Sequence, residues 1–78
     1  MSLGIQIKAM IKEILQLNYD INEDTALLGG IPEFDSMAVV TLLTAIEEQY
    51  GIMIDDDEVD AEIFETVGTL ISFVEQKV

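Results

Sequence analysis

The chain has 78 residues, a length that allows one domain with one small hydrophobic core. Half of the residues are hydrophobic, which distinguishes the chain from a disordered acidic tail. Its 16 acidic and three basic residues give a net charge of −13. This charge excludes nucleic acid and anionic membranes as partners, because binding them requires clustered Lys and Arg. Because we find neither an apolar run long enough for a bilayer nor the pattern of a signal peptide, we expect a soluble, cytoplasmic protein.

The first segment has the apolar spacing of an amphipathic helix. Asn18 and Asp20 indicate where this helix ends. The apolar positions that predict its buried side are Leu3, Ile7, Met10 and Ile14, flanked by Ile11 and Leu17.

A long connection over residues 18–35 follows the first helix. Loops of this length are uncommon in compact domains unless they are packed or functional. Gly29, Gly30 and Pro32 oppose helix formation near its end. Its apolar residues are spaced like anchors on a core: Ile21, Leu27, Leu28, Ile31 and Phe34.

The second helix is predicted to run from Ser36 to about Tyr50. Asp35 is a suitable N-cap, and Gly51 suits the left-handed residue that follows a helix. The predicted buried stripe is Val39, Leu42, Leu43, Ile46 and Tyr50. Met37 falls roughly opposite this stripe, whereas Ser36 and Val40 lie on its border.

The remainder of the chain predicts a short helix and a last helix. The short helix is expected over residues 57–63, with Val59 and Ile63 facing inward, and Thr66 is a reasonable N-cap for the last one. The last helix is expected to bury Val67, Leu70, Ile71 and Val74. The predicted fold class is therefore all-α: a single domain over residues 1–78, built as a four-helix bundle of three main helices, one short helix and a long first loop.

The residue inventory limits the chemistry of the chain. It contains no His, Cys, Arg or Trp, so a serine nucleophile has no His to activate it and zinc has no His or Cys ligand. The acidic run that starts at Asp55 lacks the mid-loop glycine of an EF-hand. We therefore expect no enzyme and no dedicated metal site, only weak and nonspecific binding of divalent cations.

The triplet Asp35-Ser36-Met37 has two readings. On its own it is an ordinary helix start, with Asp35 as the cap. However, Ser36 would lie at the positive end of the strongest helix, where free N–H groups and the helix dipole stabilise a phosphate. The preceding loop would leave Ser36 accessible, and a long substituent could fold back over the neighbouring Val40.

Several segments then resemble the acyl carrier protein family. The triplet is similar to the family's Asp-Ser-Leu signature, whose serine carries 4′-phosphopantetheine. The resemblance continues through Leu27 and Leu28 as loop anchors, through Ala45-Ile46-Glu47-Glu48-Gln49-Tyr50, through Ile52-Met53-Ile54 followed by acids, and into Thr66-Val67 at the start of the last helix. It covers nearly the whole chain in order.

This resemblance implies a function. A phosphopantetheinyl transferase (holo-carrier synthase), using coenzyme A and magnesium, would attach the arm to Ser36, and Asp35 would help to organise the metal and the phosphate. The arm would carry acyl groups as thioesters to acyl-transferring or acyl-activating enzymes. Our candidates for sheltering the acyl chain are Val40, Ile46, Ile54 and Ile63.

The sequence departs from carriers of bulk fatty acid synthesis at Ala38 and Thr41, because the matching positions there are usually acidic. A partner face on the exposed side of the second helix is predicted to contain Met37, Thr41, Thr44 and Glu48. We therefore expect a monomeric carrier for a lipid, polyketide or other specialised acylation pathway, with partners whose docking patches are basic or partly apolar. A peptidyl or aminoacyl carrier and a non-carrier acidic adaptor remain as alternatives.

Overall fold

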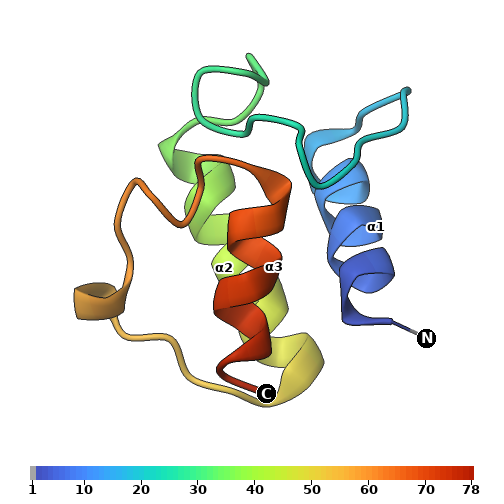
Figure 1. The fold of residues 1–78 in the computed structure, drawn as a ribbon. Helices are drawn as coiled ribbons and strands as arrows, with labels where there is room; N and C mark the ends of the chain where they lie inside the picture. The colour runs from blue at the N-terminus through green and yellow to red at the C-terminus, as the bar shows by residue number, and fades with distance from the viewer. Residues whose placement is uncertain (1) are drawn as a thin grey trace.

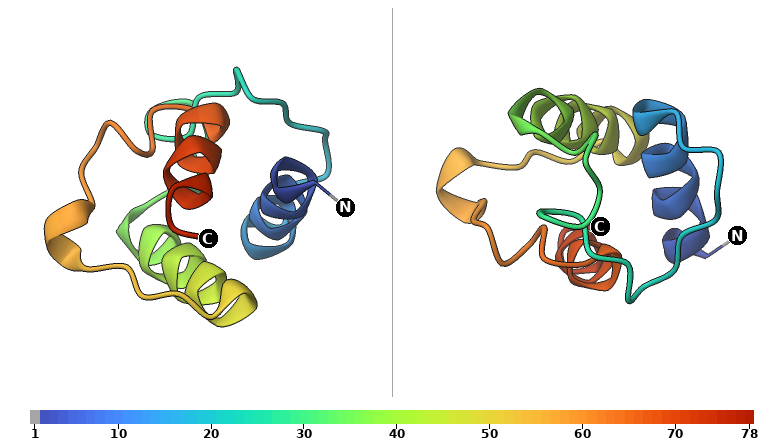
Figure 2. Two further views of the ribbon diagram at one scale, coloured as in Figure 1. Left: turned by 60° about the horizontal axis from the view of Figure 1, so that its bottom comes forward. Right: turned by 90° about the horizontal axis from the view of Figure 1, so that it is seen from above.

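The computed structural model describes residues 2–78, apart from the side chain of Asp56. Within them the chain forms α1 (Leu3–Leu15), α2 (Ser36–Tyr50), the short 3-10 helix η1 (Asp56–Glu58) and α3 (Val67–Glu75), as Figure 1 shows. Helix α1 packs against both α2 and α3, and a view from above shows the three helices around a shared interior (Figure 2). The only strand-like pairing in this part of the chain is an isolated bridge between Ala26 and Thr66. The all-α class is therefore confirmed.

Helix α1 ends earlier than predicted. Its N-cap is Ser2, whose hydroxyl accepts a hydrogen bond from the Ile5 amide, and the helix ends at Leu15. The next residue, Gln16, has a left-handed backbone with φ of 55°. This conformation costs a residue other than glycine about 1–2 kcal/mol, so a glutamine at this position does not predict the end of a helix. Lys12 in the last turn holds the returning loop through Asp20 at 2.8 Å.

Helix α2 has the predicted bounds. The Asp35 carboxylate accepts from the Ala38 amide at 2.9 Å, and Gly51 ends the helix with φ of 65°. The buried residues are Ala38, Leu42 and Ile46, whereas Val39, Leu43 and Tyr50 of the predicted stripe are only partly buried. The buried side of α2 is thus rotated slightly from the predicted one, toward the small side chain of Ala38.

The predicted short helix over residues 57–63 is wrong. The chain forms η1 at Asp56–Glu58 and then a hydrogen-bonded turn over residues 61–64. An α-helix here would stack like charges one turn apart, for example Glu58 with Glu62, without a lysine between them to offset the repulsion. Carboxylates support the non-helical course: Glu58 accepts from the Asp55 amide, and Asp60 accepts from the Ile63 amide.

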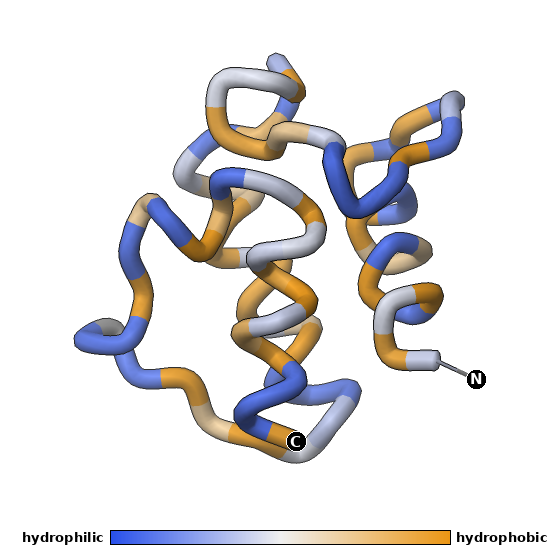
Figure 3. Tube along the Cα trace, in the orientation of Figure 1, coloured by the Kyte–Doolittle hydropathy of each residue, from blue (hydrophilic) through white to orange (hydrophobic). Residues whose placement is uncertain are grey.

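Helix α3 and the core agree with the sequence pattern. Thr66 and Thr69 form a capping box, in which each hydroxyl accepts from the other residue's amide. The four residues predicted to be buried are the four buried residues of α3: Val67, Leu70, Ile71 and Val74. The buried apolar residues form one cluster. Along the chain trace, the segment around η1 is largely hydrophilic (Figure 3). No helix among residues 2–78 combines the length and the apolar character that a bilayer span requires.

The long loop is tied to the start of α3. Four of its predicted anchors are buried, namely Ile21, Leu27, Ile31 and Phe34, but Leu28 is 42% exposed, which corrects that assignment. The amide of Leu28 instead donates to the carbonyl of Phe64, so this residue is held by its backbone. Similar bonds join residues 23–27 to residues 65–68, and the rings of Phe34 and Phe64 lie 5.6 Å apart. The chain that enters α2 is therefore held in place by α3.

Candidate functional site

Ser36 is the first residue of α2, and its side chain is exposed. Buried residues hold the chain on both sides of it: Phe34 is 6% exposed and Ala38 is 8% exposed. Asp35 is exposed and caps the helix. This arrangement presents a hydroxyl at the surface on a backbone that is fixed from both sides.

The amides around Ser36 suit a phosphate group. The Asp35 carboxylate accepts a hydrogen bond from the Ala38 amide, and the Asp35 carbonyl accepts one from the Val39 amide at 3.0 Å. Among the described residues, the amides of Ser36 and Met37 have no acceptor. An anion on the Ser36 oxygen would find these two donors and the positive end of the α2 dipole. The residues present therefore fit a phosphodiester at this position.

The four candidates for an acyl-chain pocket are not equivalent. Ile46 is fully buried in the core, whereas Val40 is 61% exposed. Ile54 and Ile63 are partly buried and pack against the core from the segment between α2 and α3. Three of the four thus contact or belong to the core, and Val40 lies outside it, one turn from Ser36.

All four residues of the predicted partner face are exposed, and Met37 is 73% exposed. They are Met37, Thr41, Thr44 and Glu48. The exposed Val40 adds a second apolar side chain beside them. Ala38 does not belong to this face, because it is buried.

The sequence analysis missed three residues that support the site. Phe64 is 2% exposed and packs on Phe34, which precedes Asp35 and Ser36 in the chain. Glu47 accepts from the Ile54 amide at 2.8 Å and so fixes the chain that follows α2. Lys77 pairs with Glu58 and holds η1. A bulky aromatic residue after an acidic run was a usable signal for Phe64, whereas the two polar contacts depend on the fold.

Comparison with known proteins agrees with this geometry. The family model of the phosphopantetheine attachment site matches residues 6–74. An acyl carrier protein of Sulfurovum sp. (strain NBC37-1) is 37% identical over 76 residues, which cover 96% of this chain and 97% of that protein. The acyl carrier protein AsbD of Bacillus anthracis is 31% identical over 70 residues, with coverages of 90% and 77%.

A solved structure leads to the same family. The solution NMR structure of a holo acyl carrier protein from Nitrosomonas europaea superposes with a TM-score of 0.86 at 40% identity, covering 97% of this chain and 95% of that one. Members of this family are carriers and not catalysts, and they interact with a phosphopantetheinyl transferase and with enzymes that handle acyl groups. The chain belongs to the acyl carrier protein family, and its cofactor is a covalently attached 4′-phosphopantetheine.

Proposed function

We propose that the Ser36 oxygen is the attachment point of the phosphopantetheine arm and that the single domain of residues 1–78 serves a specialised acylation pathway. The observation that carries the first part is the exposed Ser36 hydroxyl at the start of α2. It lies between the buried residues Phe34 and Ala38 and beside two amides that have no acceptor among the described residues. When bound, the arm supplies a thiol that holds acyl groups as thioesters.

Asp35 has two roles in this proposal. Its carboxylate caps α2 and so keeps the helix start, with the Ser36 hydroxyl, in one place. One carboxylate oxygen is engaged with the Ala38 amide, and the side chain is exposed. The free oxygen can face the transferase and help to position its magnesium ion, because this hard cation prefers carboxylate oxygens.

For the acyl chain we keep Val40, Ile46, Ile54 and Ile63 as the sheltering residues. Val40 is exposed close to Ser36 and can meet an acyl chain first. Ile46 has no exposed surface, so an acyl chain can reach it only after neighbouring side chains of the core move aside. Ile54 and Ile63 are partly buried against this core. Both lie on the segment between α2 and α3, which belongs to no α-helix and is held by the few polar contacts described above.

The specialised pathway is inferred from the partner face. Thr41 and Thr44 are exposed and uncharged, and Met37 and Val40 make this side of α2 apolar. Charges at the rim of an interface mainly accelerate association with a partner of opposite charge. We infer that the dedicated partner accepts an apolar surface centred on Met37. The protein is further proposed to be monomeric, and its cytoplasmic location remains a prediction.

The attachment site is tested by the variant Ser36→Ala. The protein is incubated with a phosphopantetheinyl transferase, coenzyme A and magnesium, and its intact mass is measured. The unmodified sequence should gain the mass of one arm, and Ser36→Ala should gain none while keeping its helical circular dichroism. Ser72→Ala, at an exposed serine in α3, is the matched control and should be modified normally. Modification of Ser36→Ala would refute the assignment.

The partner face is tested with an enzyme of bulk fatty acid synthesis that loads a malonyl group onto the holo protein. The double variant Thr41→Glu, Thr44→Glu should be loaded faster than the unmodified protein, with a lower KM. The variant Ala9→Glu, Ser72→Glu adds the same charge at exposed positions of α1 and α3 and should change little. If both pairs act equally, or if the unmodified protein is already loaded like a bulk carrier, this face does not set partner choice.

A further inference from the structure

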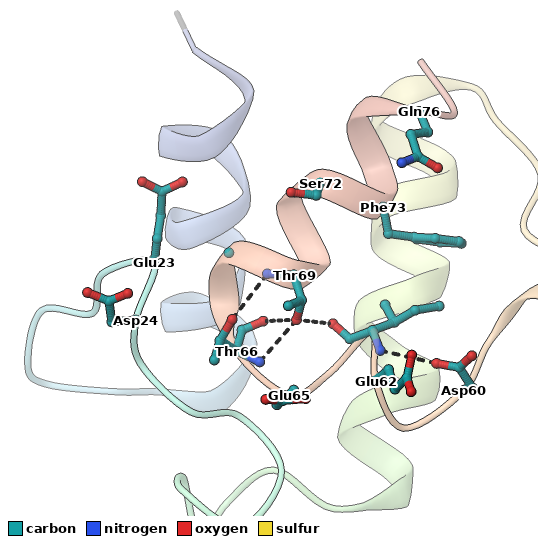
Figure 4. A pocket seen from close by; sticks show the side chains of 12 residues that line it. Glu23, Asp24, Asp60, Glu62, Glu65, Thr66, Thr69, Ser72, Phe73 and Gln76 are labelled. Atoms are coloured by element: carbon teal, nitrogen blue, oxygen red, sulfur yellow. Dashed lines mark hydrogen bonds between the residues drawn. The ribbon is translucent and has the colours of Figure 1, made fainter.

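A wide hollow lies on the outer face of α3, and Ile63 is the one lining residue that it shares with the candidates for sheltering the acyl chain. Its volume is about 770 Å³, and its lining comes from α3, from the long loop and from the segment before α3. None of the lining residues belongs to α2. Figure 4 shows Glu23 and Asp24 on one side of α3, and Asp60 and Glu62 on the other.

The floor of the hollow carries no charge. It consists of the side of α3 opposite to its buried residues, with Thr69, Ser72 and Gln76 one turn apart and Phe73 beside them. Phe73 is only partly buried and offers an apolar contact at the edge of the core. The Thr69 hydroxyl is already engaged, because it donates toward the carbonyls of Ile63 and Thr66. The face is thus an unpartnered, largely uncharged helix surface.

The walls of the hollow are acidic on both sides. No lysine is among the residues that line the hollow. Its five exposed carboxylates are those of Glu23, Asp24, Asp60, Glu62 and Glu65. Among the described residues, the carboxylates of Glu23, Glu62 and Glu65 accept no hydrogen bond, whereas Asp60 accepts from the Ile63 amide. No three acidic groups in the described chain are close enough together to hold a metal ion. The charges therefore line two separate edges of an uncharged trough.

We propose that this hollow is a second docking surface, which takes a basic segment of a partner protein. Cationic side chains of the segment would meet the carboxylates on both walls, and an apolar side chain between them would pack on Phe73. Charge complementarity selects this occupant, since groups of opposite sign steer association and fix the register of the complex. A second copy of the chain is disfavoured, because it carries the same net charge of −13. The surface would let the carrier stay on one protein while α2 and Ser36 face another enzyme.

The binding test uses a short capped peptide with four lysines and one central phenylalanine, labelled for fluorescence anisotropy. The variant Glu23→Gln, Glu62→Gln, Glu65→Gln removes three wall charges whose carboxylates form no hydrogen bond or ion pair with the described part of the chain. The control Glu13→Gln, Glu33→Gln, Asp57→Asn removes three exposed charges outside the hollow, so both variants have the same net charge. We expect the wall variant to weaken binding about tenfold, as three lost ion pairs of modest strength imply, and the control to change it less than about twofold. Equal weakening by both variants would refute a defined surface and show attraction by net charge alone.

A second pair of variants tests the floor. Ser72→Lys places a cation in the middle of the hollow, and Ala9→Lys adds the same charge at an exposed position of α1. Ser72→Lys should weaken peptide binding far more than Ala9→Lys. Amide NMR shifts on addition of peptide should concentrate at residues 68–76, in Ser36→Ala as in the unmodified protein. Shifts centred on α2 would refute the proposal and leave the attachment of the arm to Ser36 unaffected.

Discussion

Replacement of Asp35 by two different residues separates its structural contribution from its chemical one. Asp35→Ala removes the acceptor of the Ala38 amide, which lies 2.9 Å from the carboxylate oxygen. Loss of an N-cap costs about 1 kcal/mol, in a range of about 0.5–2 kcal/mol. Asp35→Asn keeps an acceptor of nearly equal capping strength and loses the same charge. The difference between the two variants therefore isolates the capping hydrogen bond from the effect of charge.

The expected values follow from the size of the domain. For 60–100 residues, about 1 kcal/mol corresponds to a shift in Tm of about 4–8 °C, so Asp35→Ala should melt that much below Asp35→Asn. Thermal unfolding followed by circular dichroism measures this difference. If the two variants melt together, the hydrogen bond to Ala38 does not stabilise α2 and the reasoning fails.

The same variants test the chemical role of Asp35. If its carboxylate helps to position the magnesium ion of the transferase, attachment of the arm should slow equally in Asp35→Ala and Asp35→Asn, because both lack the charge. Slowing in Asp35→Ala alone would show that only the position of the helix start matters. The initial rate of arm transfer, measured by intact mass at a temperature where both variants are folded, distinguishes the two.

Two further predictions concern charge. The net charge of −13 produces self-repulsion, so Tm should rise with added salt and rise more with millimolar calcium or magnesium; an unchanged Tm would contradict this. The hydrogen bond from Lys77 holds the pKa of Glu58 below its ordinary value of 4.5, so this pair contributes stability above pH 4.5 that is lost as the pH falls through the lowered pKa. Lys77→Gln should therefore lower Tm at pH 7 more than Lys8→Gln, since Lys8 forms no ion pair in the described chain. The difference in Tm between the two variants should vanish in acid. A difference that stays constant at all pH values would contradict a stabilising pair of Lys77 and Glu58.

Much of the fold could be predicted because its helices are bounded by local signals. Asp35, Gly51 and Thr66 act on the residues next to them, and the structure confirms all three as caps. The apolar period of α3 was equally clear, since each of its four buried residues follows the helical spacing. Such features need no knowledge of distant contacts.

The remainder depended on contacts between distant segments. Gln16 adopts a left-handed conformation although glycine would suit it better, and Leu28 is held by its backbone and not by its side chain. The prediction of a helix at 57–63 did not take into account the repulsion between its acidic side chains. For the site, sequence reasoning located the exposed Ser36 at the start of α2, but not the support that Phe64 gives to Phe34.

The backbone bonds between the long loop and the start of α3 also set the order in which the surroundings of Ser36 can form. Residues 23–28 and 64–68 bond to each other across the intervening α2 and η1, so they pair only after the later segment has been synthesised. A nascent chain that ends before Phe64 can already contain α1, Ser36 and α2, yet it lacks the aromatic partner of Phe34 and the acceptors of Leu27 and Leu28. The surroundings of Ser36 are thus completed only by residues that follow it in the chain and are synthesised after it.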